Sequence, residues 1–286
     1  MTEPFLIRAA RPTDKRDVEA LCARIWSDDY IGDVFDDWVR DRRGRLWVAV
    51  SDGHVVGIAK LTVHANGESW LHGLRVHPDH RRRGIATALL EHRLARARAL
   101  GARVSRLDTA AYNVAIQRLM GRYGFRRIAR VAGYAAPAAA GERPRLATRR
   151  DLPALRRLAR EQRAMVHEPH FVRELVSADL TGAIRLRRAY AVGPVGDPFA
   201  FALVDQLRDR EHGARLLAQV IAGTPAGMRD LLRGLRAEAR ALRLGRAGIA
   251  APDRQWGVVR AAGYRRRWPE TMFVFERRLV AAAPPA

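Results

Sequence analysis

One segment of the chain, from Leu74 to Leu90, reads as an apolar strand that runs through a tight basic turn into a helix. Pro78 interrupts the strand, and from Ala86 onward apolar residues recur with the three-and-four spacing of a helix that buries one face. The helix is therefore expected to begin near Gly84. Its first turn has backbone N–H groups without intrahelical acceptors and carries the positive end of the macrodipole, so it is suited to bind a phosphate.

The residues of this turn restrict which phosphate-containing ligands are expected to bind there. Gly84 has no Cβ, so a phosphate can approach the backbone closely, and Arg81, Arg82 and Arg83 add positive charge. The chain has no G-x-x-x-x-G-K-[ST] motif, and this turn carries one glycine where the dinucleotide motif G-x-G-x-x-G has three. Sites for nucleoside triphosphates and for NAD are therefore not expected.

The spacing Arg81-x-x-Gly84-x-Ala86 resembles the pyrophosphate loop of the GCN5-related N-acetyltransferase (GNAT) superfamily. The resemblance extends over residues 5–134, in which the order and spacing of the other elements also agree. These elements are a strand at Ile7–Ala10 with Asp14 at the start of a helix, strands at Leu46–Val50, Val55–Val63 and Val104–Thr109, and a helix that opens at Asn113 and ends in Gly124-Phe125.

The resemblance implies an α/β (α+β) fold with a mixed, mostly antiparallel twisted sheet that is flanked by helices and splayed at the fourth strand. In the family, acetyl-CoA (coenzyme A) is bound at the turn, its pantetheine arm lies in the splayed gap, and a strand N–H polarises the thioester carbonyl. Leu74 and Val76 hold that strand position, and both are equally compatible with a plain core role. Asn113 is either a cofactor contact or a helix cap. The implied cofactor-binding residues are Leu74, Arg75, Val76, Arg81, Arg82, Arg83, Gly84, Ile85, Ala86, Thr87 and Asn113.

His72 is the first choice for a general base. It precedes Val76 by four residues, as a histidine or glutamate does in several family members, and an imidazole titrates near neutral pH. We expect it to act through a water, with Glu68 as second choice. A histidine that only hydrogen-bonds in a half-buried strand is an equal alternative. Strict alternation would place Glu68, His72, Leu74 and Val76 on one face, unless Gly73 marks a bulge that turns the side chains.

The general acid departs from the family pattern. Many members have a tyrosine seven residues after the helix-opening asparagine, but this chain has Met120, whose thioether has no proton to donate. Tyr123 lies three residues further on and is the candidate acid. An aromatic residue that packs under the core is the stronger alternative for Tyr123.

The acceptor side is expected at the segment Asp28–Asp41, which has six acidic residues and one arginine, a local charge of −5. An acidic surface there would attract a cationic amine, and Tyr30, Phe35 and Trp38 could form an apolar wall for it. A solvated amphipathic helix explains the same spacing equally well. The resemblance implies a small-molecule amine or amino acid as the acceptor.

The net charge of +22 raises the question of nucleic-acid binding. Lys15 and Lys60 are the only lysines, so 50 of the 52 basic residues are arginine, a composition typical of GC-rich codon usage. No block of arginines with interleaved aromatic residues forms a base-stacking surface. No specific nucleic-acid partner is therefore expected.

The remaining composition indicates a cytoplasmic protein. With Cys22 as the only cysteine, the chain cannot form an internal disulfide, which favours a reducing compartment. No leader segment and no membrane span are expected, and no metal site is indicated. The sequence leaves open whether the chain forms a homodimer.

The chain contains an internal repeat. The segment Leu100–Arg127 is echoed by Leu242–Arg266, and the Gly124/Gly263 pair gives an interval of 139 residues. Near the start of each half, Asp14 and Asp151 open a leucine-rich helix at an interval of 137. Two agreeing markers indicate duplication of a whole domain. We therefore expect an acetyltransferase domain at 1–140, a degenerate copy at 141–286, and a linker over 135–143.

The second copy differs at the phosphate turn. Its counterpart, Val220–Met228, has no arginine and lacks the R-x-x-G-x-A spacing, and Pro225 removes one amide donor although it can open a helix. Pro252 stands where the first copy has Asn113. The second copy is therefore expected to bind no cofactor and to pack against the first or shape its acceptor pocket.

Two functions follow from these observations. The first is an acetyl-CoA-dependent N-acetyltransferase that acts in the first domain by direct attack of a primary amine on the thioester. The second is a non-catalytic acyl-CoA-binding or nucleic-acid-associated regulator, which the missing tyrosine and the basic composition suggest.

Overall fold

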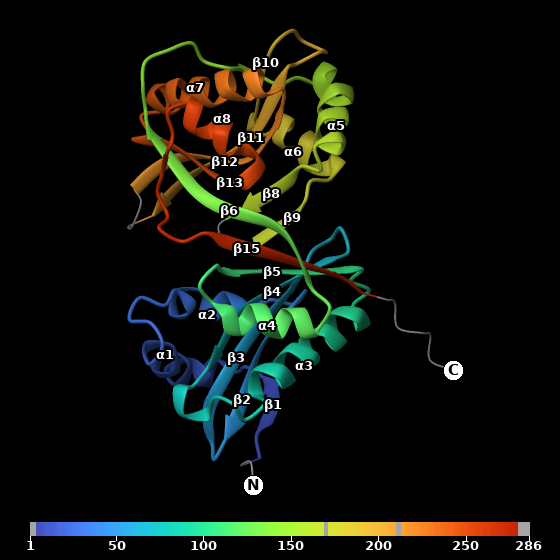
Figure 1. The fold of residues 1–286 in the computed structure, drawn as a ribbon, viewed down its shortest axis with the longest axis vertical. Helices are drawn as coiled ribbons and strands as arrows, with labels where there is room; N and C mark the ends of the chain where they lie inside the picture. Colours follow the sequence, from blue (N-terminus) through green and yellow to red (C-terminus); the bar gives the residue numbers. More distant parts are fainter. Residues whose placement is uncertain (1–3, 169–170, 210–212, 280–286) are drawn as a thin grey trace, which may run out of the picture. The chain divides into compact units, whose positions relative to one another are not determined.

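The computed structural model describes residues 4–168, 171–209 and 213–279, which form two compact units (Figure 1). Of these residues, the first unit contains 4–108, 114–127 and 275–279, and the second contains 109–113 and 128–274. The units are therefore not separated at a single point of the sequence, whereas one boundary after residue 140 was expected.

The first unit is built on a twisted mixed sheet with the strand order β1-β2-β3-β4-β5. The first four strands pair antiparallel, and only β4 and β5 pair parallel, over three residue pairs from Glu68/Val104 to Trp70/Arg106. Beyond Trp70 the two strands separate, so the expected splay at the fourth strand is confirmed. The strands are β1 (Leu6–Ala9), β2 (Arg45–Ser51), β3 (His54–Val63), β4 (Glu68–Val76) and β5 (Val104–Ala110).

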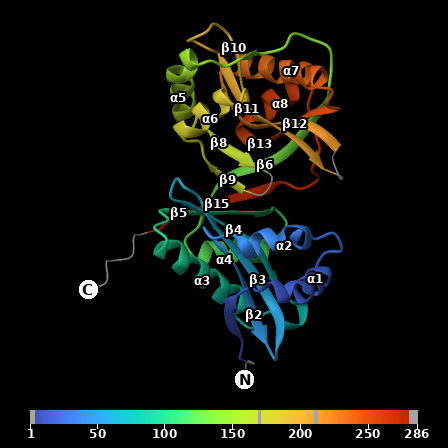
Figure 2. The same ribbon diagram turned by 180° about the vertical axis from the view of Figure 1, so that it is seen from behind.

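Helices cover both faces of this sheet, as the two opposite views show (Figures 1 and 2). Helices α1 and α2 pack through Val18, Ile31 and Phe35 against one face, and α3 packs through Ile85 and Leu89 against the other. Successive apolar residues of β2 and β3 point to opposite faces, so these strands contribute side chains to the cores on both sides of the sheet. The helices are α1 (Lys15–Ala23), α2 (Ile31–Arg40), α3 (Ile85–Ala99) and α4 (Val114–Arg122), with short 3₁₀ helices at Pro12–Asp14 and Pro78–His80.

The second unit repeats this order of elements, which confirms the duplication. Its sheet has the order β7-β10-β11-β12-β13-β6, and again only β12 and β13 pair parallel. A hairpin, β8 with β9, is inserted between α5 and α6. The elements are β7 (Arg145–Leu146), α5 (Leu152–Glu161), β8 (Met165–Glu168), β9 (Phe171–Glu174), α6 (Ser177–Arg185), β10 (Ala189–Val192), β11 (Ala200–Asp209), β12 (Gly213–Gly223), α7 (Pro225–Ala241), β13 (Arg246–Pro252), α8 (Trp256–Ala261) and β14 (Arg265–Arg266), with 3₁₀ helices at Arg149–Asp151 and Asp253–Gln255.

The last strand of each repeat belongs to the unit that the other repeat builds. Strand β6 (Arg126–Pro137) follows the first repeat but pairs antiparallel with β13 over residues 131–137. Strand β15 (Met272–Arg278) follows the second repeat, and its residues from Phe275 onward lie beside β5 in the first unit. The linker expected over 135–143 is therefore wrong for Ala135–Pro137, because these residues form strand hydrogen bonds.

One ion pair recurs at the start of each repeat. Arg8 forms two hydrogen bonds of 2.7 and 2.8 Å with Asp14, and Arg145 forms two of 2.9 and 2.8 Å with Asp151. Both arginines precede their aspartates by six residues, and 137 residues separate the two pairs. In each case the carboxylate also accepts the backbone N–H three residues before it, so the pair ties the first strand to the first helix.

The buried pair in the second unit predicts a dependence of stability on pH. Hydrogen bonds from Arg145, Thr148 and Gly196 lower the pKa of Asp151 against the opposing effect of burial. A lowered folded-state pKa stabilises the fold above the unfolded value of about 3.9, and this stabilisation is lost as the pH falls below it. We expect Asp151→Asn to reduce the free energy of unfolding at pH 7 by about 2 kcal/mol and to flatten its acid dependence. Denaturant unfolding from pH 7 to pH 3 measures both, and the exposed Asp197→Asn is the control.

Candidate functional site

The basic turn between β4 and α3 has the shape that the sequence predicts. After the 3₁₀ helix at Pro78–His80, Arg82 and Gly84 adopt left-handed backbone angles, with φ of 62° and 83°, and α3 begins at Ile85. A Cβ added to Gly84 would have no atom within 4 Å, so the space in front of the helix end is open. Arg81 and Arg82 are exposed beside it. An anion here would meet the amide groups of the first turn of a 15-residue helix.

Strand β4 contains the bulge that Gly73 suggested. The register with β3 shifts between Arg75, which is opposite Ile58, and His72, which is opposite Lys60, so Gly73 and Leu74 together face one residue. Gly73 has a φ of 65°, as the first residue of a glycine bulge requires. The extra residue reverses the side-chain alternation. Strict alternation across this strand is therefore wrong.

The bulge divides the candidate residues between two faces. His72 lies on the α2 side, where its ring is 4.7 Å from the ring of Trp38, and its Nε2 is 2.9 Å from Thr62 Oγ1. Leu74 and Val76 pack on the α3 side with Ile85 and its neighbours. Both strand residues thus have core contacts, and their backbone lies along the edge where β4 separates from β5.

The buried Arg93 of α3 supports the bulge from below the sheet. Its guanidinium donates to the carbonyl oxygens of Leu89, Lys60 and His72 at 3.1, 3.3 and 3.4 Å. Burial lowers the pKa of Arg93 to about 9. The bulge interrupts the β3–β4 ladder, and the guanidinium satisfies two carbonyl groups at that point.

Arg75 does not direct its side chain toward the basic turn. It contacts Asp29 through hydrogen bonds of 2.7 and 3.3 Å, and its guanidinium lies 4.3 Å from the ring centre of Trp26. The side chain of Asp29 is only 2% exposed, so this is a buried pair. Arg75 was expected among the cofactor-binding residues. Because its side chain is held by Asp29, only its backbone is left for such a contact.

The aromatic residues expected on the acceptor side lie in α2 and at its start. Tyr30 and Trp38 meet edge to face at 6.0 Å, and Trp38 continues the row to His72. Phe35 is fully buried in the core with α1 and the sheet, so it supports this wall from behind and offers no surface to an acceptor. Burial raises the pKa of Tyr30 to about 12.

The acidic segment is less negative than its composition indicates. Asp29 pairs with Arg75, Asp36 with Lys15 at 2.6 Å, and Asp41 with the buried Lys60. Asp37 also lies 3.9 Å from Arg40 of the same helix, so four of the six carboxylates are paired with cations of the same unit. The continuous acidic surface that the sequence suggested is therefore not present along the whole segment.

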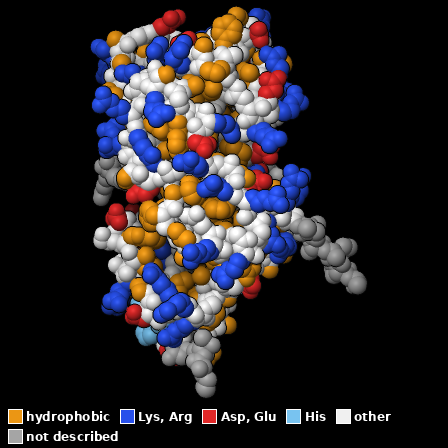
Figure 3. All heavy atoms as spheres, viewed as in Figure 1, with side chains coloured by type: hydrophobic (Ala, Val, Ile, Leu, Met, Phe, Trp, Pro, Cys, Tyr) orange, Lys and Arg blue, Asp and Glu red, His pale blue; other side chains and the backbone are white. Residues whose placement is uncertain are grey.

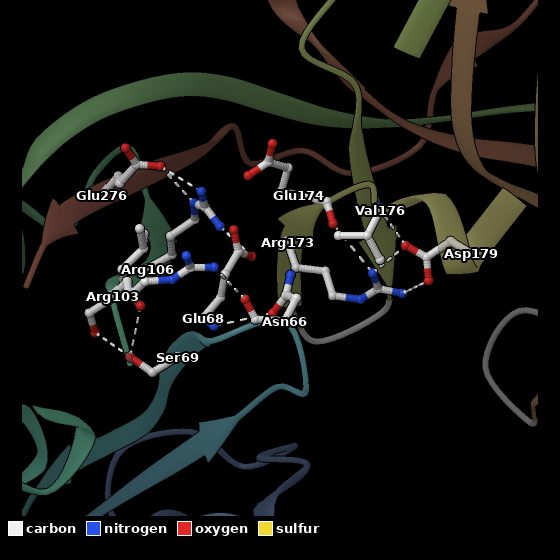
Figure 4. A network of polar contacts seen from close by, with 12 residues as sticks. Asn66, Glu68, Ser69, Arg103, Arg106, Arg173, Glu174, Val176, Asp179 and Glu276 are labelled. Carbon is white, nitrogen blue, oxygen red and sulfur yellow. Dashed lines mark hydrogen bonds and ion pairs between the residues drawn. The ribbon is translucent and has the colours of Figure 1, made fainter. Parts of the chain in front are cut away.

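Glu68, the second candidate base, is held in an ion-pair network (Figure 4). It contacts Arg106 of β5, which also contacts Glu276 of β15 at 2.7 and 2.8 Å. Glu68 and Arg106 are each 5% exposed. The network joins β4, β5 and β15 at the closed end of the splay, four residues before His72.

The candidate acid lies just after α4 and not within it. Helix α4 ends at Arg122, and the hydroxyl of Tyr123 contacts the carboxylate of Glu91 on α3. This hydrogen bond raises the pKa of Tyr123 and so opposes proton donation. Met120 is buried, as a thioether in a core is expected to be. Asn113 directly precedes α4, as predicted.

Asp108 of β5 is a residue that the sequence analysis missed. Its side chain is partly buried, and burial raises its pKa to about 6. Arg106, two positions before it, contacts Glu68, so alternation along β5 and β4 places Asp108 on the same face of the sheet as Glu68 and His72. The available signal was an acidic residue within a strand, two positions after Arg106.

In the second unit, two glutamine side chains hydrogen-bond to the backbone of β12 beyond its last pair with β13. Gln162 exchanges two hydrogen bonds of 2.6 and 3.2 Å with the backbone of Gly223, and Gln255 donates to the carbonyl of Ile221 at 3.1 Å. At the start of α7, Thr224 caps the N–H of Gly227 at 3.1 Å. Pro225, the first residue of the helix, has no N–H.

Basic side chains are dispersed on the surface drawn in Figure 3, with acidic side chains between them. No single arginine block stands out on that face. Among the described residues, no helix has the length and apolarity that crossing a membrane requires.

Comparisons with known proteins agree with this geometry. The model of the acetyltransferase (GNAT) family matches residues 14–125. No curated protein matches the sequence.

Several solved structures share the fold of nearly the whole chain. A GCN5-related N-acetyltransferase from Sphaerobacter thermophilus is 17% identical with a TM-score of 0.62, covering 96% of this chain and 95% of that one. Proteins from Thermoplasma acidophilum and Pyrococcus horikoshii, whose assignment as acetyltransferases is provisional, are 16% and 15% identical, with TM-scores of 0.60 and 0.58. They cover 96% and 97% of this chain, and 100% and 90% of their own lengths. At these identities the likeness concerns the fold.

The bulge predicts that position 73 tolerates no side chain. A Cβ on Gly73 would lie 2.6 Å from Trp38 Cζ3, whereas one on Gly53, at a φ of 79°, would meet no atom within 4 Å. Both Gly→Ala variants force an L-residue into left-handed geometry, at about 1–2 kcal/mol. Gly73→Ala should cost a further 1–3 kcal/mol, roughly, from overpacking. Equal losses in denaturant unfolding of the two variants would contradict the steric role of Trp38.

Proposed function

The chain belongs to the GNAT acetyltransferase family through residues 14–125, and we propose that its first unit transfers an acetyl group from acetyl-CoA to a primary amine of a small molecule or amino acid. One observation carries the proposal. The open left-handed turn at Gly84 directly follows the strand edge where β4 separates from β5. The turn that suits a phosphate is thus contiguous with the separated edge of β4, along which we propose that the extended arm of the ligand lies.

The residues of this region fit an acyl-CoA substrate, the class that the family uses. The amides of Ile85, Ala86 and Thr87 open α3, where a pyrophosphate would face unpaired N–H groups, and Arg81, Arg82 and Arg83 supply the positive charge. The backbone of Leu74 and Val76 borders the gap. When bound, the thioester supplies an electrophilic carbonyl carbon. We propose that a strand N–H at this edge stabilises negative charge on the carbonyl oxygen.

We propose His72 as a general base that acts on the acceptor, and we give Glu68 a structural role. His72 lies at the mouth of the splay beside Trp38, while Glu68 contacts Arg106 at the closed end. Tyr30 and Trp38 are proposed to contact the acceptor. Because Tyr123 directs its hydroxyl to Glu91, we do not give it the role of acid.

We propose that the second unit binds no cofactor. Gln162 and Gln255 occupy backbone groups of β12 that a ligand in the gap would need, and Thr224 and Pro225 remove amide donors at α7. The regulatory alternative has no observation of its own in its favour. Acetyl-CoA binding without turnover would bring it back.

Substitution at Gly84 tests the cofactor site. Gly84→Glu places a negative side chain in front of α3, and Gly101→Glu, at the other end of the same helix, has a similar φ of 76° and equally open space. Acetyl-CoA should raise the Tm of the wild type and of Gly101→Glu but not that of Gly84→Glu. The macrodipole favours a carboxylate at the N-terminus, so helix destabilisation does not explain the expected loss. Stabilisation of all three proteins would contradict the site.

His72→Ala tests the base. General base catalysis contributes typically 10²–10⁴-fold, so kcat/KM at pH 7 should fall by about 100-fold or more, with less loss at high pH where the amine is deprotonated in solution. The exposed His54→Ala is the control. The assay measures thiol release from acetyl-CoA with amino acids, polyamines and other primary amines. Full activity of His72→Ala at pH 7 would remove this residue from the mechanism.

A further inference from the structure

Asp108 stands opposite His72 across the opening of the splay. The parallel ladder runs from Glu68/Val104 to Trp70/Arg106, with a constant offset of 36 residues. Two residues further along each strand, on the same face, this register places His72 of β4 level with Asp108 of β5. Neighbouring residues in register share a face of a sheet, and the effect of Asp108 on Tyr30 agrees with the α2 side. The two side chains therefore lie on the same face, two residues beyond the last pair of the ladder.

Within the part of the chain that the structure describes, no cation is paired with the carboxylate of Asp108. Asp29 pairs with Arg75 and Asp41 with Lys60 on the same side of the sheet, but no basic residue among those described forms an ion pair with Asp108. An unpaired carboxylate withdrawn from water is costly and is common at functional sites. The titratable and charged groups on this side near it are Tyr30, Arg75, Asp29 and His72.

We propose that Asp108 receives the ammonium group of the acceptor and accepts its first proton. This inference rests on the proposed function and adds to it that the acceptor is a cationic primary amine. The aromatic faces of Tyr30 and Trp38 suit a desolvated cation beside a carboxylate. Asp108 supplies the counter-charge that the acidic segment, with four of its carboxylates already paired, provides only in part.

The proton balance needs two acceptors. The ammonium group loses one proton to Asp108 before its nitrogen can attack the carbonyl carbon. As the C–N bond forms, the nitrogen loses a second proton to His72. The C–S bond breaks, the thiolate leaves with the electron pair and takes up one of these protons, and the other passes to solvent. A separate tyrosine acid is thus unnecessary, which accounts for Met120 in the usual tyrosine position.

The test compares Asp108→Asn, which is isosteric and uncharged, with the control Asp52→Asn, at an exposed aspartate in the turn between β2 and β3. Thiol release from acetyl-CoA is measured with spermidine, lysine and tryptamine from pH 6 to pH 10. We expect Asp108→Asn to lower kcat/KM by about 100-fold or more at pH 7 and to recover activity as the free amine accumulates at high pH. Acetyl-CoA should raise its Tm as it does that of the wild type. Asp108→Glu, which keeps a carboxylate, should retain the wild-type pH profile.

Each other outcome overturns the proposal. Asp108→Asn within threefold of the wild type and with the same pH profile removes the role of Asp108 and leaves the proposed function intact. The same holds if Asp108→Glu shows the pH profile of Asp108→Asn. A wild-type protein that is stabilised by acetyl-CoA but inactive with all three amines excludes a cationic acceptor of this class. If acetyl-CoA also fails to stabilise the wild type, the proposed function itself is wrong.

Discussion

The arrangement of the first unit depends on one extra residue in β4. Gly73 adopts a left-handed conformation that only glycine tolerates easily, and it brings the backbone so close to Trp38 that no Cβ fits between them. Before this point β4 presents His72 to the α2 side, and after it Leu74 and Val76 turn to α3. The same strand thus places a polar residue beside Trp38 on one face of the sheet and apolar residues against α3 on the other.

The bulge has an electrostatic support on the other side of the sheet. Arg93 is a fully buried cation whose hydrogen bonds go to three backbone carbonyls, two of them at the interrupted ladder. A buried guanidinium with only carbonyl partners is weakly compensated, and its lowered pKa reflects this. The desolvation cost of Arg93 therefore falls at the bulge, next to His72. Such local costs tend to concentrate at functional sites.

The second repeat keeps this frame but differs along the corresponding strand edge. It keeps the Arg145–Asp151 pair, the parallel strand pair and a register shift at Leu203/Val204. Glutamine side chains nevertheless hydrogen-bond to the separated strand β12. These backbone groups of β12 are therefore already satisfied, and a satisfied group has no free hydrogen bond to offer a ligand. The fold alone therefore does not indicate a function for the second unit.

Local signals predicted much of this structure. The basic turn, the start of α3, the bulge at Gly73 and the 137-residue repeat were all visible in the sequence, because each depends on residues near in the chain. The exchange of β6 and β15 was not, since strand pairing depends on edges that distant segments create. Phe35 was given a surface role because helical spacing does not indicate which apolar residue lies deepest.

Asp108 shows most clearly why the site could not be read completely from the sequence. In the chain it is one acid in a strand, 36 residues from His72, and nothing local distinguishes it from Asp29 or Asp41. Its character follows from two non-local facts, the parallel register that sets it opposite His72 and the absence of an ion-pair partner among the described residues. Asp29 and Asp41 became counter-ions because cations of other strands reached them. A carboxylate that no cation of its own unit reaches is left for the cation of a substrate, and only the folded register reveals which one that is.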